Sequence, residues 1–131
     1  MRKLRGLYVE DCRMTYLLVQ RTLRHYAYIR NAPSKEVFLE ETGRPLYDFL
    51  ILDGDIVGWP MEDYISCVLN VQRIPSFIFS GSNPSALTPL LEVHPKAVVK
   101  KTDGVQILSQ AVLSFFYAQE PLRERRIRPT R

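Results

Sequence analysis

Polar residues suited to phosphoryl chemistry follow four short apolar segments of the chain. They are Glu10 and Asp11 after the first of these segments, then Asp53, then Ser80 with Gly81, and finally Lys100. Carboxylates gathered in one pocket repel one another, and a hard divalent cation such as Mg²⁺ neutralises them through oxygen ligands. An aspartate in such a pocket can attack phosphorus, while a hydroxyl and an amine hold the phosphate oxygens. These residue types therefore predict an aspartyl-phosphate site, if the fold brings them together.

The elements that must position these residues are five apolar runs separated by segments of helical length. The runs cover residues 6–9, 26–29, 49–52, 76–79 and 97–99. They lack in/out alternation, which is typical of strands buried on both faces of a parallel sheet. Five helices are predicted between and after them: one with Met14, Leu17, Leu18 and Leu23, one capped by Ser34 and stopped by Gly43, and others over 61–69, 84–91 (disturbed by Pro89) and about 107–115.

This alternation of strands and helices predicts an α/β fold, a three-layer α/β/α sandwich around a five-stranded parallel sheet with right-handed crossovers. In such open sheets, ligands bind beyond the carboxyl ends of the strands. The candidate residues occupy that position after four of the five runs. Singly, each could be a helix cap, a turn residue or a solvated charge. Their joint occurrence in chain order favours a functional site.

Composition and charge limit the remaining classes. With 131 residues, 46% of them hydrophobic, the chain fits one compact domain. No apolar stretch reaches the roughly 18 residues of a membrane span, and no signal-peptide core follows the N-terminus, so we expect a cytoplasmic protein that does not bind membranes. The net charge of +4 owes much to five arginines after residue 120. We interpret 1–119 as the domain and 120–131 as a basic C-terminal tail or linker stub, with nucleic acid or an acidic partner as the alternative role of the tail.

Over residues 4–117, the sequence resembles the receiver domains of bacterial-type two-component response regulators. The segment Leu7-Tyr8-Val9-Glu10-Asp11 is similar to the family's first strand with its acidic pair, and Asp48-Phe49-Leu50-Ile51-Leu52-Asp53 to the third strand with its phosphoacceptor. The segment Ile74-Pro75-Ser76-Phe77-Ile78-Phe79-Ser80-Gly81 is similar to the fourth strand with its switch hydroxyl, and Val98-Val99-Lys100 to the fifth strand with its lysine.

The resemblance implies a flavodoxin-like (CheY-like) sheet in the order 2-1-3-4-5 and a signalling switch rather than an enzyme. Asp53 would take a phosphoryl group from a phosphohistidine of a histidine kinase or histidine phosphotransfer protein, and would lose it slowly by self-catalysed hydrolysis. Mg²⁺, or Mn²⁺ in its place, would be held by Glu10, Asp11, Asp53 and the backbone carbonyl of Asp55, while Ser80, Gly81 and Lys100 would bind the phosphate. A downstream protein would bind the face formed by residues 84–91, 97–99 and 107–115, and this face is also compatible with a homodimer.

Two alternatives stay open. Lys101 stands where the family usually has a proline, and the loop after Asp53 departs from the family pattern, which favours a degenerate receiver that acts only as an interaction module. Asp53-Gly54-Asp55 is also similar to the DxD motif of haloacid-dehalogenase-type phosphohydrolases. That motif opens its own fold near the N-terminus, whereas here it follows the third predicted strand. Its position in the chain therefore disfavours the hydrolase.

Overall fold

A computed structural model describes residues 2–117 of the chain. The predicted domain over 1–119 falls almost entirely within this range, and the predicted tail over 120–131 lies outside the described residues. The elements follow one another as β1 (Leu4–Val9), α1 (Arg13–Leu23), β2 (Ala27–Ala32), α2 (Lys35–Thr42), β3 (Phe49–Leu52), α3 (Met61–Leu69), β4 (Ser76–Ser80), α4 (Pro84–Leu87), η1 (Thr88–Val93), β5 (Ala97–Lys100), η2 (Lys101–Asp103) and α5 (Val105–Tyr117).

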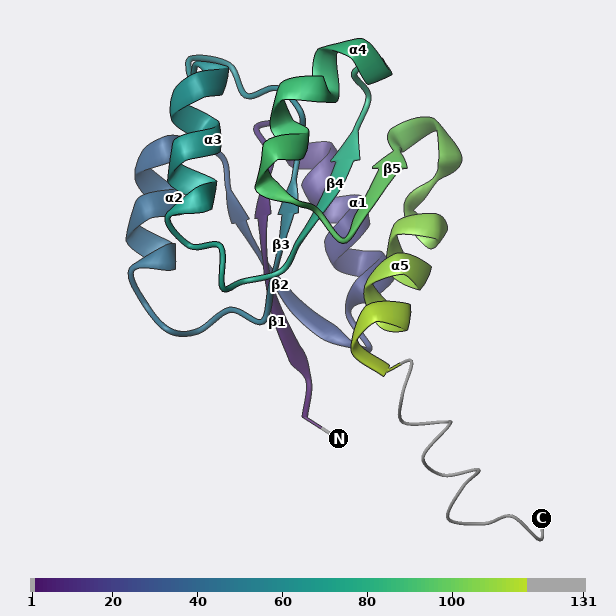
Figure 1. Cartoon of the computed structure of the whole chain (residues 1–131). Coiled ribbons are helices and arrows are strands. Elements are labelled where there is room, and N and C mark those ends of the chain that lie inside the picture. The colour runs from purple at the N-terminus through teal and green to yellow at the C-terminus, as the bar shows by residue number, and fades with distance from the viewer. Residues whose placement is uncertain (1, 118–131) are drawn as a thin grey trace, which may run out of the picture.

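The sheet confirms the predicted topology. Its five strands are all parallel and lie in the order β2-β1-β3-β4-β5. Figure 1 shows helices on both faces of the sheet, as expected for a three-layer sandwich. Because the strands are parallel, their carboxyl ends share one edge of the molecule, where ligands bind in folds of this kind.

Two apolar cores flank the sheet. One packs α2, α3, α4 and η1 against one face, with Phe38, Tyr64 and Leu90 fully buried. The other packs α1 and α5 against the opposite face around Phe49 and Phe77. Side chains alternate between these cores along each strand, since successive residues of a strand point to opposite faces. This alternation decides which polar residues meet beyond the strand ends.

The first helix buries a different face from the one indicated by its apolar residues. Met14 is 77% exposed and Leu18 53% exposed, whereas Tyr16, Val19 and Leu23 face the core. The hydroxyl of Tyr16 donates to the Ile29 carbonyl of β2 at 2.8 Å, which satisfies the polar end of a largely apolar side chain. An aromatic residue with a polar tip thus replaces an aliphatic one at the interface with the sheet.

The second and fourth helices begin and end where local chemistry predicts. Ser34 caps α2 by accepting from the Val37 N–H at 3.4 Å, and Gly43 ends the helix. The fourth predicted helix is α-helical only over Pro84–Leu87 and continues as the 3₁₀ helix η1, in agreement with the disturbance expected from Pro89. Across residues 2–117, none of the helices has both the length and the apolar character needed to cross a bilayer.

Gly6 provides a test of this packing. A Cβ added at Gly6 would lie 2.5 Å from Cζ of Phe49, whose ring also packs against Phe77 and Phe116. The ring has no free space to move into, so we expect Gly6→Ala to lower the free energy of unfolding by about 1–3 kcal/mol. Urea denaturation measures the change. Gly43→Ala is the matched control, because the added Cβ would come no closer than 3.4 Å to its nearest neighbouring atoms. Equal losses of stability in both variants would contradict the packing argument.

Candidate functional site

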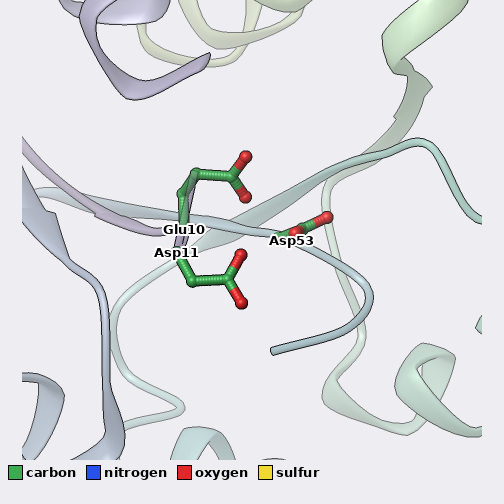
Figure 2. A group of neighbouring side chains, drawn as sticks. All are labelled: Glu10, Asp11 and Asp53. Atoms are coloured by element: carbon green, nitrogen blue, oxygen red, sulfur yellow. The ribbon is translucent and has the colours of Figure 1, made fainter. Parts of the chain in front are cut away.

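Three carboxylates meet at the carboxyl edge of the sheet. Glu10 and Asp11 directly follow β1, and Asp53 directly follows β3, its neighbour in the sheet. Carboxylate oxygens of the three residues lie within 4.8 Å of one another. Figure 2 shows the side chains of Glu10 and Asp11 projecting on the same side as Asp53. The structure therefore brings the three predicted acidic residues together in one cluster, which we call the acidic pocket.

Backbone hydrogen bonds fix the two chain segments that carry these acids. The Glu10 N–H donates to the Ala32 carbonyl at 3.2 Å, and the Asp53 N–H donates to the Val9 carbonyl at 3.0 Å. The side-chain amide of Asn31 also donates to the Glu10 carbonyl at 2.9 Å. The hydrogen-bond ladder of the sheet thus extends one residue beyond β1 and β3, and it holds the backbone of Glu10 and Asp53 in place.

Lys101, and not Lys100, supplies the amine of the acidic pocket. The Lys101 Nζ lies 2.9 Å from Oε1 of Glu10 and 3.5 Å from Oδ1 of Asp53. Lys100, the predicted lysine, is exposed at the end of β5, and the ion pairs of the acidic pocket among residues 2–117 do not include it. The reason is strand alternation: Lys101 lies on the same side as the buried Val99, whereas Lys100 points to the opposite side.

Electrostatics in the pocket are dominated by the burial of Glu10, whose side chain has no exposed surface. Burial raises the pKa of the Glu10 carboxyl to about 8, Asp53 adds to this effect, and the Lys101 ammonium opposes it. Burial also disfavours the charged form of Lys101, but Glu10 and Asp53 outweigh it and raise the pKa of this amine. The lysine therefore stays charged at neutral pH, and a cation bound beside Glu10 would favour the charged form of its carboxyl further.

Asp53 is held from its side chain and from its backbone. The Gly54 N–H donates to Oδ1 of Asp53 at 2.8 Å. The hydroxyl of the fully buried Tyr64 in α3 donates to the Asp53 carbonyl at 2.6 Å. Trp59 packs against Tyr64 with ring centroids 4.7 Å apart, and its indole N–H donates to Asp63 at 2.9 Å. The aromatic pair Trp59 and Tyr64 thus fixes the backbone of Asp53, a residue that is 8% exposed.

The loop after Asp53 closes over the outer side of the pocket. The Val57 N–H donates to Oδ2 of the exposed Asp11 at 3.0 Å, which ties this loop to the end of β1. Asp55 lies in the same loop with an exposed side chain. Its backbone carbonyl as a metal ligand stays a prediction.

Ser80 approaches the pocket from the other side of the sheet. A Cβ on Gly54 would lie 2.5 Å from Oγ of Ser80, so the absence of a side chain at Gly54 allows this close approach. The Ser80 hydroxyl accepts from the Ser82 N–H at 3.0 Å and keeps its own proton available for donation. Next to it, a Cβ on Gly81 would meet only Cδ of Lys101, at 3.8 Å. Ser80 and Gly81 therefore border the pocket, and their role in binding phosphate stays a prediction.

The residues of the pocket fit a divalent cation. Oε2 of Glu10 and the hydroxyl of Tyr8 are buried and have no hydrogen-bond partner among the described residues. Buried polar atoms in native proteins are normally satisfied, so an orphaned carboxylate oxygen beside two further carboxylates indicates a missing ligand. Three carboxylates form an all-oxygen ligand set, which suits Mg²⁺ or Mn²⁺. Glu10, Asp11 and Asp53 are the side chains that could hold it.

Sequence reasoning missed Lys101, Tyr64 and Tyr8. Lys101 was detectable, because Val99 is the central apolar residue of its strand and alternation then selects the residue two positions later. Tyr8 was detectable in the same way, as it precedes Glu10 by two residues. Tyr64 carried no local signal, since its contact with Asp53 depends on how α3 packs against the sheet.

Comparisons with known proteins agree with this geometry. No protein-family model matches the sequence, and no curated protein matches it either. Similar solved structures include the response regulator DrrB of Thermotoga maritima (TM-score 0.75, 14% identity, 90% of this chain and 54% of that chain). They also include a putative response regulator from Chloroflexus aurantiacus (TM-score 0.72, 22% identity, 86% and 96%). A third is a response regulator from Burkholderia pseudomallei containing a phosphorylated aspartic acid, a calcium ion and citrate (TM-score 0.70, 16% identity, 94% and 72%).

These similarities show that the chain has the CheY-like fold of response regulator receiver domains. The match spans nearly the whole described chain, and the neighbours share the same sheet architecture. At these levels of sequence identity the resemblance establishes the fold.

The raised pKa of Glu10 leads to a test of the metal site. Metal binding requires the charged carboxylate, so a proton must leave when Mg²⁺ binds below about pH 8. We expect Mg²⁺ affinity to rise with pH by up to about tenfold per unit until this value is reached, and then to level off. Titration followed by the fluorescence of Trp59, the only tryptophan, measures it. Glu10→Gln should bind more weakly and lose this dependence, and an affinity independent of pH in the native protein would contradict the argument.

Proposed function

We propose that this protein is a phosphoacceptor receiver domain that takes a phosphoryl group from a phosphohistidine onto Asp53. The observation that carries the proposal is the convergence of three carboxylates and one ammonium at the carboxyl edge of the sheet. A cytoplasmic two-component system, or phosphorelay, is the setting in which a domain of this fold would meet such a donor. A bound calcium ion and a phosphorylated aspartate occur in one similar structure, which supports the same chemistry here.

The chain's own residues divide the work of the transfer. Oδ1 of Asp53 already accepts from the Gly54 N–H and faces Lys101, so Oδ2 is the oxygen that attacks phosphorus. The O–P bond forms as the P–N bond of the phosphohistidine breaks, and the imidazole nitrogen leaves with the electron pair. Glu10, Asp11, Asp53 and the Asp55 carbonyl would hold Mg²⁺, which would neutralise charge on the transferred oxygens.

Lys101 and Ser80 then hold the product from the two sides of the sheet. The Lys101 ammonium exchanges its ion pair with Glu10 for a phosphoryl oxygen, and the Ser80 hydroxyl donates its free proton to another. Gly81 leaves room for the phosphoryl group, because the space where a Cβ would lie has Cδ of Lys101, at 3.8 Å, as its nearest neighbour. Slow hydrolysis returns Asp53 to its free state, so the domain acts as a timed switch.

Partners follow from the two exposed surfaces next to these residues. Met14 in the first turn of α1 and Val57 in the loop after β3 are 77% and 88% exposed, and we assign them to contact with the histidine kinase or phosphotransfer protein. Leu91, Val98 and Phe115 are about half exposed on η1, β5 and α5, and this apolar face suits a downstream protein or a second copy of the chain. Changes at Ser80 and Lys101 reach it directly, because α4 follows Ser80 and Lys101 follows β5.

Asp53→Asn tests the nucleophile. We expect acetyl phosphate with Mg²⁺ to add the mass of one phosphoryl group to the native protein and none to the variant, with both giving the same circular dichroism spectrum. Intact-protein mass spectrometry with and without Mg²⁺ measures the label. Absence of labelling in the native protein would leave an interaction module instead of a phosphoacceptor, and catalytic release of phosphate from monoesters would indicate a DxD-type hydrolase.

A matched pair of lysine variants tests the assignment of Lys101. Lys101→Met removes the positioned cation, and we expect labelling of Asp53 to slow by roughly 100- to 1000-fold, as for other removed donors of this kind. The same change at the exposed neighbour, Lys100→Met, should leave the rate within about twofold of the native protein, because surface charges act weakly. Time courses of acetyl phosphate labelling, quenched at intervals and read by intact-protein mass spectrometry, give the labelling rates of both variants. The reverse pattern would return the role to Lys100.

A further inference from the structure

A basic groove lies at the end of the molecule opposite the acidic pocket. It has a volume of about 450 Å³ and runs between the last turns of α1 and the start of β2. Lys3, Gln20, Arg21, Arg24 and Tyr28 are among the residues that line it, above an apolar floor that includes Leu17. None of these residues belongs to the site described above, and the proposed function gives the groove no role.

The charge of the groove is not compensated within the described part of the chain. None of the ion pairs formed among residues 2–117 involves Lys3, Arg21 or Arg24. Two neighbouring arginines do have acidic partners, Arg2 in Asp48 and Arg30 in Glu41, whereas the three cations that line the groove have none among these ion pairs. The groove therefore presents a positive field to any anion that approaches this end.

An exposed aromatic side chain accompanies these cations. Tyr28 is 60% exposed on the edge strand β2, and the ammonium of Lys3 lies 4.2 Å from its ring centroid. Tyr26, just before β2, is 45% exposed. Exposed tyrosines among arginines and lysines are the arrangement by which proteins hold unpaired nucleotides, with bases stacked on rings and phosphates on cations.

The end of α5, after which the sequence is rich in arginine, lies at the same end of the molecule as the groove. Figure 1 shows the end of α5 near the start of β1 and the end of α1, away from the carboxyl edge of the sheet. Tyr117, the last residue of α5, is followed in the sequence by five arginines and two glutamates. A ligand seated in the groove is thus close to the point from which this basic sequence continues.

We propose that the groove is a binding site for single-stranded nucleic acid. Arg21, Arg24 and Lys3 bind consecutive phosphates, and the Tyr28 ring stacks on an unpaired base. A double helix offers no free base face to such a ring, and an acidic peptide or an anionic membrane offers charge without a base. The site is independent of Asp53, because the two lie at opposite ends of the parallel strands.

Fluorescence anisotropy of labelled oligonucleotides of about 12 nucleotides, with the full chain, tests the proposal. We expect binding that weakens steeply between about 50 and 200 mM salt. Removing two phosphate contacts with Arg21→Ala plus Arg24→Ala should weaken binding and make the slope of log affinity against log salt shallower by about 1.4. Tyr28→Ala should weaken binding roughly 5- to 150-fold without changing that slope, which a purely electrostatic role would not produce.

Controls separate this site from other sources of affinity. Arg44→Ala removes one charge from the loop after α2, on the other layer of the sandwich, and should bind as the native protein does. Asp53→Asn should also bind normally. Unchanged binding by the double arginine variant would assign all affinity to the sequence after Tyr117 and overturn the proposal. Equal displacement of the oligonucleotide by polyglutamate, or binding of phosphatidylserine vesicles in place of oligonucleotides, would overturn it too.

Discussion

The structure depends on the burial of negative charge at the end of the central strands. Glu10 and Asp53 are 1% and 8% exposed, and both lie in the middle of the sheet edge rather than at its periphery. An isolated buried carboxylate is costly, and two of them side by side are more so. The fold offsets this cost with the Lys101 ammonium, with N–H groups from the loop after β3, and with a geometry that admits a cation. Because burying these carboxylates costs free energy, a change of charge in the acidic pocket changes the stability of its arrangement.

Strand alternation explains which residues meet there. Two pairs of residues, each two positions apart, show the rule: Tyr8 with Glu10, and Val99 with Lys101. The first member of each pair packs in the core beneath α1 and α5. Ile51 and Asp53 follow the same rule. The second member of each pair therefore extends the same face beyond the edge, where core packing gives way to polar contact. Ser80 continues the opposite face, since Ile78 packs beneath α3 and η1.

Much of the fold and of the acidic site could be predicted from the sequence because the signals are local. Apolar runs gave the strands, Ser34 and Gly43 gave the limits of α2, and the acids after the first and third runs gave the cluster. The errors arose where tertiary packing decides. Leu17 and Leu18 follow Met14 at helical spacing, three and four residues later, yet Tyr16, Val19 and Leu23 face the core instead. Lys100 and Lys101 are chemically identical, and only the register of β5 distinguishes them. The Tyr64 contact joins residues from two layers and leaves no trace in the sequence.

The two faces of the sheet also determine how a change in the pocket would spread. Lys101 continues the face covered by α1 and α5, whereas Ser80 continues the face covered by α3, α4 and η1. Under the proposed function, a phosphoryl group on Asp53 would attract both side chains and so act on both helical layers at once. The two layers differ in regularity: α4 has four residues and passes into a 3₁₀ helix with Pro89 at its start, while α5 has thirteen residues with a buried face. Short helices with few regular hydrogen bonds cost less free energy to displace, so under the proposed function we expect the segment after Ser80 to move first.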